Sequence, residues 1–348
     1  MVSSLHTNNH FSSSLDKPET GHLASLSFSS SEASIVYVAE GNPPKDSGDS
    51  FHKFRFKPHF GEGIVGKKDP TIFVFSWSNP PEGESVRKLK SLSIIASALF
   101  AQPVFSSDER IIYATGYEYT LDHRLLGIKY CYNRPSGIWE ITLPPPIEDK
   151  DNAAEDSVSV TCSARKLTSS NISCRSPRLL SENGKHTLFW LSGLTGGPHA
   201  ATSLLYSLDI TSASGPKTAD SPLVDFVFDP ANGAFPGLYP DYYLPLSPFI
   251  RPSGSAVPYI ITHSIWGSRS TVLLISTTDG KVKDLTPDDG TLYSWTVLNT
   301  DGGSRVICKR STPTSPSELL LGEVDASGEV KWRVIHKPFV SSDGSYQF

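Results

Sequence analysis

Residues 176–190 read SPRLLSENGKHTLFW, two apolar runs separated by a polar turn that contains Asn183-Gly184. An Asn-Gly pair between strand-like runs is a strong hairpin signal, because both central residues of a type I′ turn need positive φ. The same form (apolar residues, Ser-x, a turn, then a β-branched strand) occurs three more times. The other copies are residues 25–37 (SLSFSSSEASIVY), 103–113 (PVFSSDERIIY) and 247–261 (SPFIRPSGSAVPYII).

The recurrence of this hairpin predicts the fold class. Repeated all-β units built from hairpins are typical of a β-propeller, in which small antiparallel sheets surround a central axis. The copies begin at residues 25, 103, 176 and 247, and this spacing leaves open that degenerate or interrupted blades lie between them. A β-sandwich is the alternative, but it would struggle to place four such copies in one body. We therefore predict an all-β propeller.

Further strand and turn signals agree with this fold. Four other turn pairs can adopt positive φ: Asp279-Gly280, Asp289-Gly290, Asp301-Gly302 and Asp343-Gly344. The segment closest to a helical pattern is 85–99, which is the candidate for a helix. Nine short β-branched or aromatic runs are predicted as strands. They are residues 34–39, 71–77, 110–115, 127–132, 187–190, 203–208, 259–263, 270–275 and 305–308.

Composition narrows the function classes. The 348 residues carry a net charge of −5, which argues against a nucleic-acid partner, since such proteins usually present a basic surface. Met1 is the only methionine, whereas Phe, Tyr and Trp number 17, 13 and 6, a balance that favours β structure. The most apolar stretch, 92–101, is half the length of about 20 residues that a bilayer span needs.

Targeting and cysteine signals predict a cytoplasmic protein without membrane association. Residues 1–16 are polar and Ser-rich, without the apolar core of a signal peptide. The four cysteines, Cys131, Cys162, Cys174 and Cys308, form no C-x-x-C pair. We expect them to be reduced and partly buried thiols.

Motifs for catalysis, cofactors and metals give no candidate residue. No Ser is flanked by Gly at −2 and +2, as a hydrolase nucleophile elbow requires, and the ten His form neither H-x-H nor H-E-x-x-H. Residues 61–66 (GEGIVG) match G-x-G-x-x-G, but Pro70 follows too closely for a phosphate-binding helix. We therefore predict no catalytic, cofactor-binding or metal-binding residue and no cofactor.

A family resemblance is carried by residues 124–139, RLLGIKYCYNRPSGIW. This run resembles acylaminoacyl-peptidases (acylamino-acid-releasing enzymes), in which a propeller strand ends in LGI-x-[FY]-C-x-N-R-x-S-x-[IL]. The resemblance extends over about residues 20 to 325 and includes 35–40 (IVYVAE), 165–169 (RKLTS), 278–286 (TDGKVKDLT) and 292–298 (LYSWTVL).

The resemblance implies an organisation. Members belong to the prolyl oligopeptidase family of serine peptidases and pair an N-terminal propeller with a C-terminal α/β-hydrolase that supplies Ser, Asp and His. This chain would hold a partial propeller of about five to six of seven blades, with the α/β-hydrolase domain absent. We predict a poorly ordered N-terminus at 1–20, the propeller at 21–337, and at 338–348 a tail towards the hydrolase domain.

Three functional hypotheses follow. The first is a non-catalytic gating propeller that acts with an α/β-hydrolase domain, in cis or as a separate chain, on short N-acylated peptides. The second is a stand-alone propeller that serves as a protein-interaction scaffold. The third, an enzyme with its site in the propeller channel, has no residue to carry it. Because an open ring exposes strand edges, we also expect self-association into a homo-oligomer.

Overall fold

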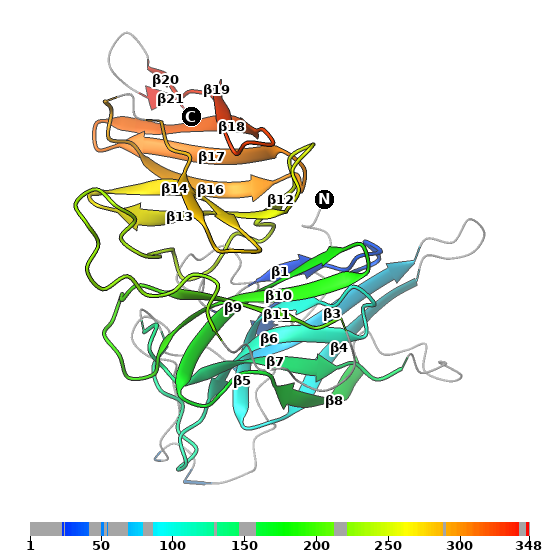
Figure 1. Ribbon diagram of the computed structural model, residues 1–348. Coiled ribbons are helices and arrows are strands. Elements are labelled where there is room, and N and C mark those ends of the chain that lie inside the picture. Colours follow the sequence, from blue (N-terminus) through cyan, green and yellow to red (C-terminus); the bar gives the residue numbers. More distant parts are fainter. Residues whose placement is uncertain are drawn as a thin grey trace. The chain divides into compact units, whose positions relative to one another are not determined.

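A computed structural model describes residues 23, 25–41, 50–51, 54, 69–78, 86–128, 131–145, 158–211, 221–287, 290–340 and 346–347 (Figure 1). Strands make up the regular structure of these residues, so the all-β prediction is confirmed. The chain divides into two compact units, which we describe separately. Unit 1 comprises residues 1–200 and 209–218, and unit 2 comprises residues 201–208 and 219–348.

Unit 1 contains two antiparallel groups of four strands and a following hairpin. The first group runs in order from β1 to β4, and the second from β5 to β8. The hairpin consists of β9 and β10. The bounds are β1 (Leu26–Phe28), β2 (Ser34–Glu40), β3 (Pro70–Ser78), β4 (Val86–Ile95), β5 (Ala98–Phe105), β6 (Ile111–Glu118), β7 (Ser136–Thr142), β8 (Val158–Lys166), β9 (Ile172–Glu182) and β10 (Lys185–Leu194).

The two groups of unit 1 are joined at their outer strands. β4 pairs with β8 in parallel, from Lys90 opposite Val158 to Ile95 opposite Ser163. A shared apolar core lies beneath this join; it includes Val36, Ile72, Phe100, Ile112, Ile141 and Val160. Hydrogen bonds and burial together therefore hold the first two groups as one body.

Unit 2 contains two four-stranded antiparallel meanders and a short hairpin. Each meander follows chain order, which is the form of a propeller blade. The apolar faces pack around Trp295, which is 1% exposed and lies 4.8 Å from the Trp332 ring. The bounds are β12 (Phe249–Ile250), β13 (Tyr259–Trp266), β14 (Arg269–Ser276), β15 (Val282–Asp284), β16 (Ser294–Thr300), β17 (Arg305–Thr312), β18 (Ser315–Val324), β19 (Val330–His336), β20 (Phe339–Val340) and β21 (Tyr346–Gln347); β11 (Leu204–Asp209) crosses the boundary between the units.

The repeat found in the sequence marks the first hairpin of successive blades. Its four copies coincide with β1–β2, β5–β6, β9–β10 and β12–β13, so no further four-stranded group of the described chain lies between them. The hairpin β16–β17, whose turn contains Asp301-Gly302, opens a fifth group that the sequence pattern did not identify. The chain is therefore a partial β-propeller, as predicted.

The predicted turns are confirmed where they are described. Asn183 and Gly184 have φ of 50° and 75°, as a type I′ turn requires, and Gly280 and Gly302 have φ of 68° and 74°. The pair at 343–344 lies outside the described residues, as do residues 1–20.

Two secondary-structure expectations were wrong. The segment 85–99, the closest to a helical pattern, contains β4, because pairing with β3 and β8 satisfies its backbone on both sides. The described residues of 127–132 form no strand. There the Cys131 N–H donates to the Ile128 carbonyl at 3.1 Å, and the Arg134 Nε donates to the Gly127 carbonyl at 2.8 Å, so that local bonds replace a ladder.

The close contacts of Gly116 predict a packing defect. A Cβ added there would lie 2.5 Å from the Trp139 Nε1 and 3.1 Å from the Phe100 ring, and two packed aromatic rings have little room to move. We expect Gly116→Ala to lower the free energy of unfolding by about 1–3 kcal/mol. Urea denaturation measures this. Gly193→Ala, whose Cβ would meet its nearest atom at 3.9 Å, is the matched control, and equal losses in the two variants would contradict the prediction.

The cysteines predict a selective thiol reactivity. Cys162, Cys174 and Cys308 are buried, and burial raises the pKa of each thiol, that of Cys174 to about 11. Cys131 is half-buried. We expect a chromogenic disulfide reagent at pH 8 to modify Cys131 in the native chain and all four thiols in denaturant. Cys131→Ser should remove the native reaction; rapid native modification of that variant would show the buried thiols to be accessible.

Candidate functional site

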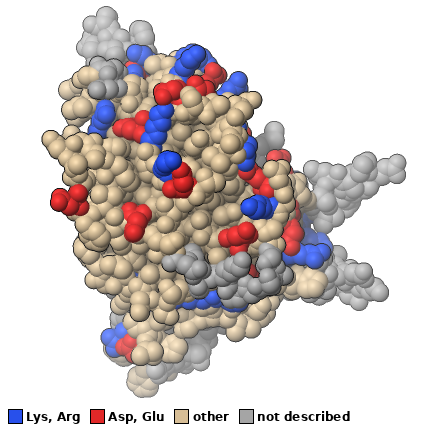
Figure 2. Space-filling view, in the orientation of Figure 1, with Lys and Arg blue, Asp and Glu red and all other residues tan. Residues whose placement is uncertain are grey.

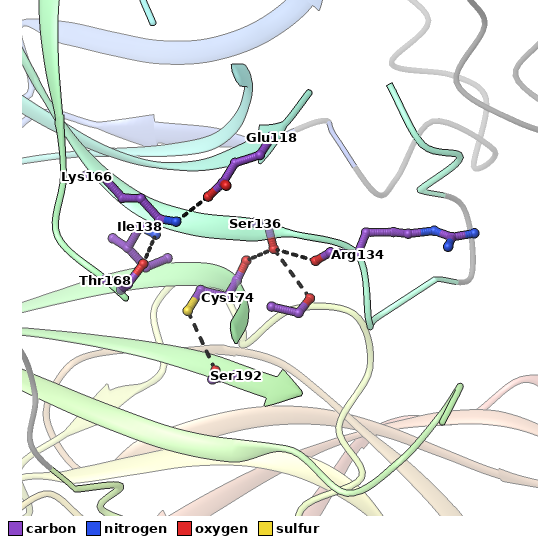
Figure 3. Close-up of polar contacts among 9 residues, drawn as sticks. Glu118, Arg134, Ser136, Ile138, Lys166, Thr168, Cys174 and Ser192 are labelled. Carbon is purple, nitrogen blue, oxygen red and sulfur yellow. Dashed lines mark hydrogen bonds and ion pairs between the residues drawn. The ribbon is translucent and has the colours of Figure 1, made fainter. Parts of the chain in front are cut away.

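The residues most like the family form a buried polar cluster at the start of β7 (Figure 3). Ser136, the first residue of β7, is 2% exposed, and its hydroxyl donates to the Cys174 carbonyl on β9 at 2.7 Å. The Ser173 hydroxyl donates to the Tyr132 carbonyl at 2.6 Å. These bonds fasten the segment before β7 to the beginning of β9.

Asn133 fastens the same segment to the turn after β10. Its side-chain amide donates to the Gly197 carbonyl, and the backbone carbonyl of Asn133 accepts the Gly196 N–H at 2.9 Å. The Arg175 guanidinium lies 4.8 Å from the centre of the Tyr132 ring, a cation–π contact inside the fold. The Asn-Arg-x-Ser part of the family pattern thus positions strands rather than presenting groups to solvent.

The residues that follow Ser136 in the pattern, Gly137 and Ile138, lie beside an ion pair. Lys166 on β8 pairs with Glu118 at the end of β6, and both side chains are largely buried. A Cβ on Gly137 would lie 2.5 Å from the Lys166 Cε and 2.9 Å from the Thr168 Oγ1, so glycine leaves room for the pair. The Ile138 N–H donates to that Thr168 hydroxyl at 3.2 Å.

The chemistry open to this cluster is limited. The Cys174 Sγ lies 3.6 Å from the Ser192 Oγ, and with its pKa raised to about 11 by burial the thiol is protonated at neutral pH. The Ser136 hydroxyl donates to a carbonyl instead of a base. Activated Ser and Cys nucleophiles need a neighbouring base or a lowered pKa, and these two groups have neither arrangement.

A second buried group links the first strands of consecutive blades. The Gln102 Oε1 on β5 accepts the Ser176 N–H of β9 at 2.7 Å and the Thr115 hydroxyl at 2.8 Å. Gln102 and Ser176 both have positive φ, 54° and 61°, and each precedes a proline. Sequence reasoning missed this group, although the x-Pro pairs at matching positions of the repeat were a usable signal.

Two described histidines have serine or carboxylate partners. The His186 Nδ1 lies 2.9 Å from the Ser107 Oγ and 3.0 Å from the Ser181 Oγ, and so ties the β5–β6 turn to the β9–β10 hairpin. The His263 Nε2 lies 2.9 Å from the Asp241 Oδ2, while its Nδ1 accepts the Val297 N–H at 3.2 Å. Both His263 nitrogens are therefore engaged, which leaves none to accept a proton from a nucleophile.

The described residues offer neither a group of metal ligands nor a membrane-spanning helix. The described residues include no group of three or more His, Cys, Asp or Glu side chains placed to hold a metal ion. Within the same residues, no helix has both the length and the apolar character that crossing a membrane requires. The G-x-G-x-x-G match at 61–66 lies outside the described residues.

The His263–Asp241 pair predicts a pH effect. The hydrogen bond from His263 is the main cause that holds the pKa of the Asp241 carboxyl below its ordinary value. The ionised carboxylate therefore stabilises the folded chain above its ordinary pKa, and this contribution is lost as the pH falls through the lowered pKa. We expect Asp241→Asn to lower the free energy of unfolding at pH 7 and to have little effect at pH 3, measured by urea denaturation. Asp229→Asn is the control; a deficit in Asp241→Asn that is equal at both pH values would contradict the account.

Comparison with known proteins places the chain in a family. A family model described as "Acylamino-acid-releasing enzyme, N-terminal domain" matches residues 18–346. Acylamino-acid-releasing enzyme 1 of Oryza sativa subsp. japonica is 28% identical over 341 residues, which are 91% of this chain and 43% of the relative. The acylamino-acid-releasing enzyme of Arabidopsis thaliana is 28% identical over 339 residues, which are 90% of this chain and 42% of the relative. The chain thus spans about two fifths of the length of these relatives.

Solved structures give weaker likenesses. Prolyl oligopeptidase B from Galerina marginata matches with a TM-score of 0.48 at 11% identity, over 93% of this chain and 37% of that one. A putative TolB from Agrobacterium tumefaciens matches with a TM-score of 0.42 at 11% identity, over 91% of this chain and 81% of that one. The family model, which covers nearly the whole chain, decides the assignment: the protein belongs to the family of N-terminal domains of acylamino-acid-releasing enzymes.

Proposed function

We propose that this chain is the non-catalytic, gating part of a serine-type acylamino-acid-releasing enzyme of the cytoplasm. In this proposal an α/β-hydrolase portion, in cis or as a separate chain, supplies the catalytic Ser, Asp and His. The observation that carries it is the family match over residues 18–346 in a chain that spans about two fifths of its relatives. The reaction served is the release of an N-acylated amino acid from a short blocked peptide.

The contacts of the polar side chains support a non-catalytic role. Ser136, Ser107 and His263 all use their polar atoms in bonds between strands or turns, as described above. Such bonds rigidify blades, and a rigid ring is suited to exclude large substrates from a site that it covers. Selection by size would then need no reacting group on the propeller itself.

An activity assay tests this proposal. We expect the purified chain to hydrolyse an acetyl-alanyl chromogenic substrate no faster than buffer. Addition of the hydrolase portion of the rice relative, expressed as a separate chain, should give a complex that prefers short blocked peptides to long ones. The hydrolase portion alone and bovine serum albumin in place of the chain are the controls.

Each outcome of the assay bears on one hypothesis. Hydrolysis by the chain alone, undiminished after treatment with a serine-directed phosphonate, would contradict a non-catalytic role. A hydrolase portion whose preference for peptide length is the same with and without the chain would contradict gating and favour the stand-alone scaffold.

A further inference from the structure

The last strand of each group, in chain order, has one edge without a partner in its own blade, and most of these edges are protected. β4 and β8 pair with each other in parallel. Beside β11, Ser203 forms a bridge to Leu238, and Leu205 forms one to Val224. β15 is only three residues long. Natural proteins usually shorten or cover strand edges in this way, because an exposed edge invites pairing with other chains.

β19 is the exception among these last strands. It ends the sheet β16–β19 (Figure 1) and has seven residues, Val330–His336. No residue in the described part of the chain pairs with its outer edge, and the following hairpin, β20–β21, forms a separate sheet. A long edge of this kind is a template on which an extended segment of another protein can add as a further strand.

The alternation of the ladder identifies the backbone groups on the outer edge of β19. At the base of the β18–β19 hairpin the Asp325 N–H donates to the Glu329 carbonyl at 2.9 Å. Hydrogen-bonded and non-hydrogen-bonded pairs alternate along an antiparallel ladder, so Lys331 and Arg333 bond to β18. The backbone groups that point away from β18 therefore belong to Val330, Trp332 and Val334.

The side chains of β19 offer an added strand two different faces. On one face lie three half-buried residues that pack against the core of unit 2: Val330, Trp332 and Val334. The position of Trp332 is fixed, since its Nε1 donates to the Leu285 carbonyl at 3.0 Å. On the other face Lys331, Arg333 and Ile335 are exposed. Because side chains alternate along a strand, an added strand would place apolar residues beside Trp332 and its intervening residues beside Lys331 and Arg333.

The exposed face of β19 is basic. From 330 to 337 the sequence contains no Asp or Glu, and its ionisable residues are Lys331, Arg333, His336 and Lys337. On the face drawn in Figure 2, by contrast, acidic and basic residues are interspersed among uncharged ones. Lys331 lies opposite Glu323, which also lies 3.5 Å from the Arg305 Nε. Arg333 lies opposite the apolar Leu321, so β18 offers its guanidinium no carboxylate at that position.

This distribution of charge selects the kind of strand that fits the edge. Two copies of β19 in an antiparallel pair would bring the Lys331 and Arg333 side chains of both copies onto one face, and like charges side by side are destabilising. A strand with Asp or Glu at alternate positions would instead place opposite charges beside these two residues. The charges therefore disfavour a second copy and favour an acidic partner.

We propose that the outer edge of β19 binds an extended acidic segment of another protein by strand addition. Asp or Glu residues of the segment lie beside Lys331 and Arg333, and the apolar residues between them cover Trp332. Backbone bonds to the edge supply affinity, and the alternation of acidic and apolar residues supplies selectivity. This binding role is separate from the gating role proposed above and does not depend on it.

Fluorescence anisotropy with a labelled peptide tests the edge. The probe is a peptide of about eight residues, the length of a strand, in which Glu and Val alternate. We expect Arg333→Glu to raise its Kd at least about tenfold, since an attraction becomes a repulsion. Lys185→Glu, the same change of charge at an exposed residue at the start of β10 in unit 1, should leave the Kd unchanged. Because Arg333 is exposed, both variants should melt within about a degree or two of the wild-type chain.

A second peptide separates strand addition from simple attraction of charges. The same peptide with each Val N-methylated keeps its charges but loses the N–H groups that would face β19, so it should bind at least about tenfold more weakly. Binding of the unmodified peptide should also slow hydrogen exchange of the amides in 330–336.

Four results would overturn the proposal. They are failure of the wild-type chain to bind the unmodified peptide, equal Kd values for the two peptides, and equal Kd values for Arg333→Glu and Lys185→Glu. The fourth is a wild-type dimer in sedimentation that the unmodified peptide dissociates, because a second copy would then occupy the edge.

Discussion

A four-stranded antiparallel sheet cannot cover its own apolar face, and the rest of this structure depends on that constraint. In unit 2 the two meanders bury Trp295, Val306 and Leu320 between them, each 1% exposed or less. In unit 1 the first two groups share a core and also join their outer strands, β4 and β8, in one ladder. The stability of the fold therefore comes from contacts between neighbouring blades. Polar groups that fix the position of one blade against the next contribute to it.

Those polar groups are the Ser, His, Glu and Gln residues that a search for catalysis would single out. The Glu109 carboxylate accepts the Ser31 N–H at 2.6 Å between the first hairpin turns of two blades. His186 and Gln102 make the next connections, to Ser107 and Ser176. The bond of Gln102 is buried between blades, where a polar group left without its partner is costly, so Gln102 is committed to the structure. The same commitment applies to Ser136 in the family-specific segment, which is buried and bonds to the Cys174 carbonyl.

Long connections mark the places where a domain of this kind can meet a partner. The connection before β12 is held at its base by backbone bonds between Val224 and Leu205, and it leaves Phe228 91% exposed.

The sequence alone determined the strand class, the turns and the repeated hairpin, because these follow from local rules: alternation of side chains and the need for positive φ at Asn183 and Gly184. The run at 124–139 also indicated the family without any structure. Only the tertiary structure decided that 86–95 is a strand between two partners, that the described residues of 127–132 form no strand, and that Gln102 bonds to Ser176. These depend on residues that are distant in the chain, and no local pattern specifies which neighbour will satisfy a backbone or side-chain group.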